Sequence, residues 1–242
     1  MSGFGDDLRA AGVSDAPPIG SLTERVLMET LPCEVDGRPV LGVGSTRLSP
    51  LTFEARGSFV VTGPSGSGRT TSLASLARSL HRWNAAMALY LVTPKIASEL
   101  AALSDWTDVA AGADAVIALA IRLQSEIREG RHQGPIAVVI ERLDDLAGTS
   151  AESSLSGLVK ACIDNDQFVV AEGEATFFGS NFGLSGVLKT SRSGLALQPE
   201  GIEGQTVFRS GFPLFTRADI PQGRGFLVER GRPEMLQVAM PG

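Results

Sequence analysis

The segment from residue 59 to residue 80 constrains the fold of this chain more than any other. It opens with a run typical of a buried strand, Phe59-Val60-Val61, and continues through a glycine-rich turn from Gly63 to Gly68. A helix is predicted next, because four apolar residues recur at the spacing of one helix face: Leu73, Leu76, Ala77 and Leu80. Strand, glycine-rich turn and helix in this order predict a P-loop, in which backbone amides at a helix N-terminus bind phosphate.

The P-loop motif G-x-x-x-x-G-K-[ST] is matched at every position except one. Gly63 and Gly68 occupy the glycine positions and Thr70 the hydroxyl position, whereas Arg69 replaces the lysine. A guanidinium is longer, planar and forked, so it binds phosphate but does not occupy the point between the β- and γ-phosphates that an ammonium takes. We therefore expect weak ATP binding. The residues expected to contact the nucleotide are Gly63, Pro64, Ser65, Gly66, Ser67, Gly68, Arg69, Thr70 and Thr71. The alternative is a glycine-rich turn that only joins a strand to a helix. It is disfavoured because the turn has both the preceding strand and the following helix of a P-loop.

Composition narrows the class of protein. The 242 residues are 43% apolar and 20% charged, which suits one large α/β domain with a filled core. A formal net charge of −6 argues against DNA as a partner, because DNA binding depends on Lys and Arg neutralising phosphates. No apolar run has the length of a membrane span and no signal sequence is visible, so we expect a cytoplasmic chain.

The remaining sequence predicts alternating strands and helices. Residues 1–20 are rich in Gly, Ala, Asp and Pro and are expected to be a flexible linker before a domain at 21–242. Short strands or turns are expected within 31–53. Further strands are expected at 87–92, 136–140, 168–171 and 195–197, helices at 113–128 and 152–163, and a hairpin at 225–229 and 234–238. This order predicts an α/β fold, namely a RecA-like P-loop NTPase with a mostly parallel central sheet, helices on both faces and a C-terminal β-hairpin.

The second half of the expected site follows the strand at 136–140. A P-loop enzyme needs an acid at such a strand tip to hold Mg²⁺, and motor ATPases add a second acid that polarises the attacking water. Glu141 stands at the first position, one methylene longer than Asp, and Arg142 stands at the second, where a cation cannot act as a base. Thr70 and Glu141 are therefore the expected Mg²⁺ ligands, and Glu141 and Arg142 a degenerate catalytic pair. A surface acidic cluster that includes Asp144 and Asp145 explains this segment equally well.

With these parts in place, the chain resembles the FtsK/SpoIIIE family of RecA-like ATPases, and most of all the C-terminal ATPase module of the type VII secretion proteins EccC and EssC. The resemblance extends over about residues 21–240 and rests on the order of segments. The segments that carry it are 23–32, 39–42, the P-loop, 168–171, 192–197 and 221–227. In the family, the strand at 168–171 is followed by a polar residue that senses the nucleotide, a position that falls on Glu172 or Glu174.

The resemblance implies ATP and Mg²⁺ as cofactors and other ATPase modules, of the same or neighbouring chains, as partners. The FtsK branch moves double-stranded DNA. The EccC branch moves small helical secreted proteins from the cytosolic part of a membrane-anchored assembly, and some of its modules dock the C-terminal signal peptide of the substrate in an apolar pocket. Departures at Arg69, Glu141 and Arg142 argue against hydrolysis here and favour a role in substrate docking or regulation. Two alternatives stay open: an active DNA translocase motor, and a stand-alone regulatory protein that binds no nucleotide.

Apolar residues in segments without a regular pattern are the candidates for peptide docking. They are Phe177, Phe178, Phe182 and the run Phe212-Pro213-Leu214-Phe215. For any one of these phenylalanines, a place in the core is the favoured alternative.

Overall fold

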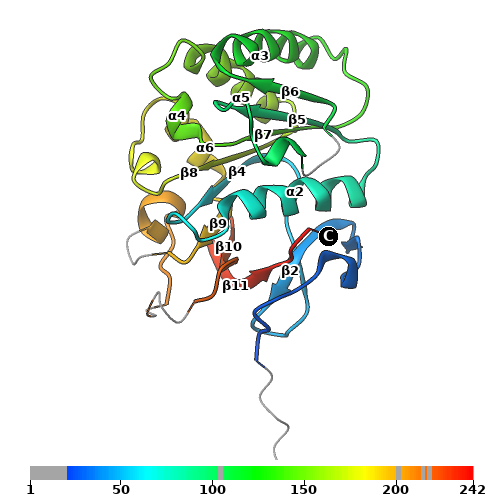
Figure 1. Cartoon of the computed structure of the whole chain (residues 1–242), viewed down its shortest axis with the longest axis vertical. Coiled ribbons are helices and arrows are strands. Elements are labelled where there is room, and N and C mark those ends of the chain that lie inside the picture. Colours follow the sequence, from blue (N-terminus) through cyan, green and yellow to red (C-terminus); the bar gives the residue numbers. More distant parts are fainter. Residues whose placement is uncertain (1–20, 103–105, 200–202, 214–215, 217–219, 242) are drawn as a thin grey trace, which may run out of the picture.

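The computed structural model describes residues 21–102, 106–199, 203–213, 216 and 220–241, so the linker expected at residues 1–20 lies outside the described part. Within that part, eleven strands form one sheet in the order β1-β2-β11-β10-β9-β4-β8-β7-β5-β6, with β3 beside β2 (Figure 1). The strands are β1 (Glu34–Val35), β2 (Arg38–Gly44), β3 (Pro50–Thr52), β4 (Gly57–Thr62), β5 (Ala88–Thr93), β6 (Asp108–Ala111), β7 (Ile136–Ile140), β8 (Phe168–Gly173), β9 (Gly194–Leu197), β10 (Arg224–Glu229) and β11 (Arg232–Val238).

Helices cover both faces of this sheet. The α-helices are α2 (Arg69–Trp83), α3 (Ala113–Arg128), α4 (Leu143–Leu146), α5 (Glu152–Asp164) and α6 (Gly183–Leu188). Short 3-10 or π turns occupy Met28–Thr30, Leu100–Ala102, Phe177–Gly179, Lys189–Ser191 and Gly204–Phe208. No helix of the described residues combines the length and the apolar character that a membrane crossing needs.

Strand β7 shows how the core is divided between the two faces. All five of its residues are buried, as expected for a parallel strand covered on both sides. Val138 and Ile140 belong to the core on the side of α3 and α5, whereas Ala137 and Val139 belong to the core on the side of α2. Because successive side chains of a strand point to opposite faces of the sheet, β7 contributes to the hydrophobic cores on both faces.

The parallel half of the sheet contains β6, β5, β7, β8, β4 and β9, and β10, β11 and β2 then pair antiparallel. The predicted fold class is confirmed, including the C-terminal hairpin of β10 and β11. Strand β6 and helix α6 were not predicted. Strand β6 lies at the sheet edge and buries only Ala110. Its sequence therefore lacks the run of apolar residues by which a buried strand is predicted.

The first described residues bind to the helix that follows the P-loop. The Arg82 guanidinium donates to the carbonyl oxygens of Met28 and Leu31 at 2.6 and 2.8 Å, and the Ser79 hydroxyl donates to the carbonyl of Val40 at 2.6 Å. The segment also meets the C-terminal end of the chain, since the Met28 amide donates to the Met240 carbonyl at 3.0 Å. The first described residues are therefore attached to α2, the helix that follows the P-loop, and the C-terminal end is attached to these residues.

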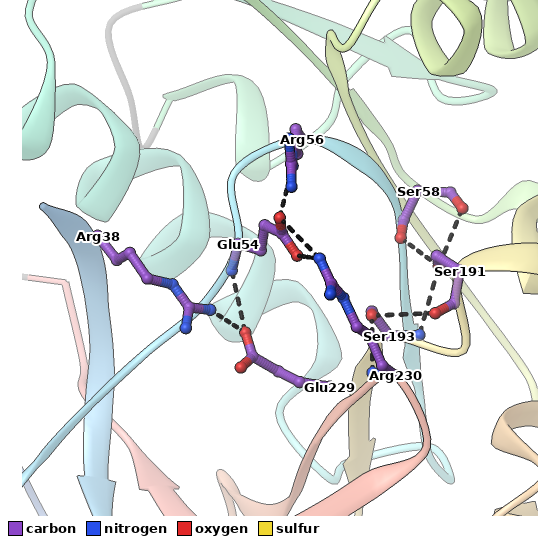
Figure 2. Close-up of polar contacts among 8 residues, drawn as sticks. All are labelled: Arg38, Glu54, Arg56, Ser58, Ser191, Ser193, Glu229 and Arg230. Carbon is purple, nitrogen blue, oxygen red and sulfur yellow. Dashed lines mark hydrogen bonds and ion pairs between the residues drawn. The ribbon is translucent and has the colours of Figure 1, made fainter. Parts of the chain in front are cut away.

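A polar network holds the β10–β11 turn against the segment that leads into β4 (Figure 2). The carboxylate of Glu54 accepts from Arg56 and from Arg230, the latter at 3.0 Å. Glu229 pairs with Arg38 and accepts from the Glu54 amide at 3.1 Å. These residues line a surface hollow of about 1190 Å³, which also contacts Trp83 at the C-terminal end of α2. Its position is thus at the opposite end of α2 from the P-loop, and five of its charged groups are paired with one another.

Candidate functional site

The P-loop has the predicted strand–loop–helix form. Strand β4 ends at Thr62 and α2 begins at Arg69, so residues 63–68 form the loop. Gly68 stands at the helix N-cap with φ of 101°, a conformation that residues with a Cβ rarely adopt. A Cβ on Gly63 would lie 2.6 Å from the Leu197 carbonyl oxygen and 2.7 Å from the Ser67 hydroxyl. Glycine is therefore required at both motif positions for steric reasons.

The connection between β9 and β10 supports the loop from outside. The Gly223 amide donates to the Ser67 carbonyl at 2.9 Å, and Gln222 and Gly223 lie beside Gly68. The side chain of Ser67 is fully buried, and its hydroxyl has no hydrogen-bond partner among the described residues. Buried hydroxyls usually have a partner. The loop fits a phosphate group through its backbone amides, which lie at the N-terminus of α2 where the helix dipole favours negative charge.

Strand β8 lies between the P-loop strand and the strand of the acidic tip. It pairs with β4 on one side, where Glu172 is opposite Val61, and with β7 on the other, where Ala171 is opposite Ile140. Because all three strands run parallel, their carboxyl ends meet at one edge of the sheet. Glu172 therefore comes between the P-loop and Glu141. The structure selects Glu172 over Glu174 as the polar residue of this strand at the site, since Glu174 is exposed and absent from the cavity lining.

Arg69 is engaged by this strand. Its Nε atom lies 3.0 Å from Oε1 of Glu172, whose side chain is only 3% exposed. The other carboxylate oxygen of Glu172 accepts the backbone amide of Arg142 at 2.8 Å. Burial raises the pKa of the Glu172 carboxyl, and the Arg142 amide and the Arg69 guanidinium partly offset that rise. The side chain at the lysine position of the P-loop thus neutralises a buried carboxylate of its own protein.

Glu141 follows β7 directly and is buried at the same edge. Its Oε2 atom accepts hydrogen bonds from the Thr93 hydroxyl at 2.7 Å and the Ser98 hydroxyl at 2.6 Å. Arg142 has a left-handed backbone with φ of 50°, is exposed, and pairs with Asp145. That hydrogen bond raises the pKa of the Arg142 guanidinium, which therefore stays charged. Asp144 and Asp145 fall in the first turn of α4, as expected for acids that begin a helical segment.

These groups meet around one cavity of about 260 Å³. It is lined by Ser65, Gly66, Gly68, Arg69, Thr70, Thr71, Lys95, Glu141, Arg142, Glu172 and Gln222. Six of the nine predicted nucleotide contacts line it, whereas Gly63, Pro64 and Ser67 do not. Lys95 and Gln222 were not singled out from the sequence. The sequence could have indicated Lys95, because it lies two residues after a strand of the parallel sheet. The carboxyl ends of such strands share one edge of the sheet.

A neighbouring cavity of about 290 Å³ lies on the other side of Gly68 and Thr71. Its walls come from four places far apart in the sequence: residues 24–25, residues 68, 71 and 72, residues 221–223 and residues 237–240. The two cavities share Gly68, Thr71 and Gln222. They are therefore adjacent parts of one depression around the start of α2.

The phenylalanines expected to dock a peptide divide between core and surface. Phe178 is fully buried, and Phe177 packs edge-on against it at 5.4 Å between ring centroids. Phe212 stacks on a core phenylalanine of β10 at 4.7 Å. Phe182 is 86% exposed. Leu214 and Phe215 lie outside the described residues.

The fold is similar to those of secretion and conjugation proteins of known structure. The cytoplasmic domain of the type VII secretion ATPase EccC from Thermomonospora curvata matches 93% of this chain and 29% of its own, with a TM-score of 0.73 and 18% sequence identity. EssC ATPases 2 and 3 from Geobacillus thermodenitrificans match 98% of this chain and 49% of theirs, with a TM-score of 0.71 and 18% identity. This chain has the fold of the EccC/EssC ATPase modules.

The likeness to EccC and EssC is structural. No protein-family model matches the sequence, and no curated protein matches it. The chain spans 29% and 49% of the lengths of the two chains named above. The pCW3 conjugation coupling protein TcpA, in its monomer form with ATPγS, also matches, over 91% of this chain and 71% of its own, with a TM-score of 0.63 and 15% identity.

Within this EccC/EssC-type fold, the cavity fits the phosphates of a nucleotide and a Mg²⁺ ion. Mg²⁺ is usually held by one or two protein oxygen atoms together with phosphate oxygens. Thr70 and Glu141 line the same cavity and are the residues that would hold it, while the metal would neutralise charge on the phosphates. The hydroxyls of Thr93 and Ser98 orient the Glu141 carboxylate.

Glu172→Gln should change how the stability of the protein depends on pH. Because burial raises the pKa of Glu172 above its unfolded-state value, the folded protein binds more protons than the unfolded chain between those two values. The free energy of unfolding that Glu172 contributes therefore falls as pH rises through this interval. The difference in unfolding free energy, parent minus variant, should decrease with rising pH by at most about 1.4 kcal/mol per pH unit.

Urea unfolding of the two proteins at a series of pH values from about 4 upward measures this difference. Glu174→Gln, at an exposed position two residues later, controls for the loss of one negative charge. A difference that grows with pH would contradict the account, because it would mean that Arg69 stabilises the carboxylate by more than burial penalises it.

Proposed function

We propose that this chain is an ATP-binding module of the EccC/EssC type whose catalytic groups do not support hydrolysis, and that it acts in substrate docking or in the regulation of an active module. Two features support ATP binding. The loop amides and the N-terminus of a fifteen-residue helix meet at the cavity, and both are favourable for phosphate. The adjoining cavity of about 290 Å³ gives the nucleoside a place next to Gly68 and Thr71.

The observation that carries the proposal is the pairing of Arg69 with Glu172. A P-loop lysine contributes to turnover because its ammonium reaches the transferred phosphate, and here the corresponding side chain neutralises a buried carboxylate. At the strand tip, Arg142 stands where an acid would orient water, and it is paired with Asp145. Loss of one such group commonly lowers the rate a hundred-fold or more, about 3 kcal/mol in the barrier. Several together leave hydrolysis near background even without additivity.

We therefore expect this module to bind nucleotide without hydrolysing it. We expect the unmodified domain to bind ATP or ADP weakly, in a manner sensitive to Thr70→Ala, and to release no phosphate above background. Arg69→Lys alone should improve the affinity more than the rate. Glu141→Asp and Arg142→Asp should be needed in addition for turnover. Calorimetry or a fluorescent ATP analogue measures the affinity, and a coupled phosphate assay measures the rate.

Two outcomes of these measurements would change the proposal. Steady Mg²⁺-dependent phosphate release at about one per second or faster, lost in Thr70→Ala, would show an active ATPase. A complete failure to bind ATP or ADP would favour the stand-alone regulatory protein.

The same module should not bind duplex DNA at physiological salt. The chain has a formal net charge of −6, so long-range attraction to a phosphate backbone is lacking. A gel-shift titration with a duplex of random sequence tests this at low and at physiological salt. Salt-sensitive binding at micromolar protein would favour the DNA translocase instead.

A secreted-protein signal peptide is the substrate element that we propose for this module. Thermomonospora curvata EccC, which has the same fold, is known in a structure of its ATPases 2 and 3 in complex with a signal sequence peptide. In this chain, Phe182 is 86% exposed directly before α6, and α6 contacts the 3-10 turn that carries the half-buried Phe177. An apolar peptide would cover these rings.

Titration with C-terminal peptides of small helical secreted proteins should therefore shift the amide resonances around Phe177 and Phe182. The shifts should be lost in Phe182→Ala, which removes an exposed ring and leaves the core intact. Unchanged resonances around these residues with every peptide would remove the support for docking here.

The partners that we propose are other ATPase modules, of the same or neighbouring chains, in the cytosolic part of a membrane-anchored assembly. The matched EccC and EssC chains are longer than this one, and both structures contain ATPases 2 and 3 of those proteins. Sequencing of the native gene on both sides of this segment tests the placement, since it should reveal further P-loops and membrane spans.

A further inference from the structure

We propose that Lys95 binds the terminal phosphates of the nucleotide in place of the missing P-loop lysine. This inference rests on the proposed ATP binding. It starts from the cations that line the 260 Å³ cavity, which are Arg69, Lys95 and Arg142 among the described residues. Arg69 is paired with Glu172 and Arg142 with Asp145. Of these three, Lys95 alone has a side chain without a hydrogen bond or ion pair to the described part of the chain.

The fold places the backbone of Lys95 beside the expected metal ligand. Lys95 follows β5, which pairs with β7 so that Val92 is opposite Ile140, directly before Glu141. The hydroxyl of Thr93 donates to Glu141 at 2.7 Å and accepts the backbone amide of Lys95 at 3.2 Å. One threonine thus connects the loop that carries Lys95 to the carboxylate at the strand tip. The position of Lys95 is fixed at the cavity while its side chain remains exposed.

The chemistry of the two cations explains the division of roles. A guanidinium remains charged when buried and suits an ion pair with a carboxylate, and Arg69 makes one such contact with Glu172 through its Nε atom. An ammonium on a flexible four-carbon stem is a compact charge with three donors that adapts to phosphate oxygens. Lys95 therefore has the side chain that a P-loop normally uses, presented from the neighbouring strand end.

Lys95→Ala should weaken ATP binding about tenfold, because it removes a charge-assisted contact to phosphate. Lys95→Arg should retain most of the affinity. Lys160→Ala is the matched control, since Lys160 is an exposed lysine on α5 that does not line the cavity. Its affinity for ATP should equal that of the parent. Circular dichroism and the thermal midpoint confirm that each variant is folded.

A second readout uses the unmodified chain, which contains only three lysines, Lys95, Lys160 and Lys189. Acylation with an amine-reactive acetyl ester, followed by mass spectrometry, reports the reactivity of each. Saturating Mg²⁺ and ATP should slow acylation of Lys95 several-fold, on the order of a charge-assisted contact. Acylation of Lys160 should not change, and adenosine, which has no phosphates, should protect neither lysine.

The outcomes separate this inference from the proposed function. If the parent binds ATP while Lys95→Ala binds it equally well and Lys95 is not protected, the role of Lys95 is wrong and ATP binding stands. If the parent binds no ATP, both are overturned. If Lys95→Ala fails to fold, protection of Lys95 in the parent decides the question.

Discussion

The candidate site depends on the position of strand β8 between β4 and β7. Backbone hydrogen bonds to both neighbours fix its register, so that Glu172 ends up between the P-loop and the tip that carries Glu141. A carboxylate that is 3% exposed needs a cation or a proton, because burial penalises its charge. Arg69 supplies that cation. This pair determines the position of the Arg69 side chain at the cavity.

The pair also explains the unusual residue of the P-loop. Arg69 and Glu172 form a buried contact in which removal of either partner would leave the other uncompensated, which is strongly destabilising in general. An arginine at the lysine position therefore has a structural role in this protein. At the candidate cavity, the start of α2 therefore offers amides, the Thr70 hydroxyl and a guanidinium whose Nε atom is engaged by Glu172, which under the proposed ATP binding makes an ammonium from elsewhere important. Lys95, attached through Thr93 to Glu141, is in the right place for that role.

The charge network and the candidate site lie at opposite ends of the same strand and helix. At the N-terminal end of β4, Glu229 pairs with Arg38 and Glu54 with Arg230, which holds the C-terminal hairpin in place, although the Nε atom of Arg38 has no partner among the described residues (Figure 2). At the C-terminal end, several polar groups lack partners among the described residues, including the Ser67 hydroxyl and one nitrogen of Arg69. Paired charges suit a scaffold, whereas unpaired donors around a cavity suit a ligand.

The sequence by itself determined the local parts of this protein. Glycines at 63 and 68 identified the loop, because only glycine fits its backbone, and buried runs such as 136–140 identified the central strands. What the sequence could not determine was which strand ends become neighbours. Strand order depends on pairing between distant segments. Only the tertiary structure therefore brought Glu172 to Arg69, showed that Glu172 and not Glu174 lines the 260 Å³ cavity, and placed Lys95 at that cavity. Local pattern decides which residues form a loop, a strand or a helix, whereas the packing of those elements decides which charges meet.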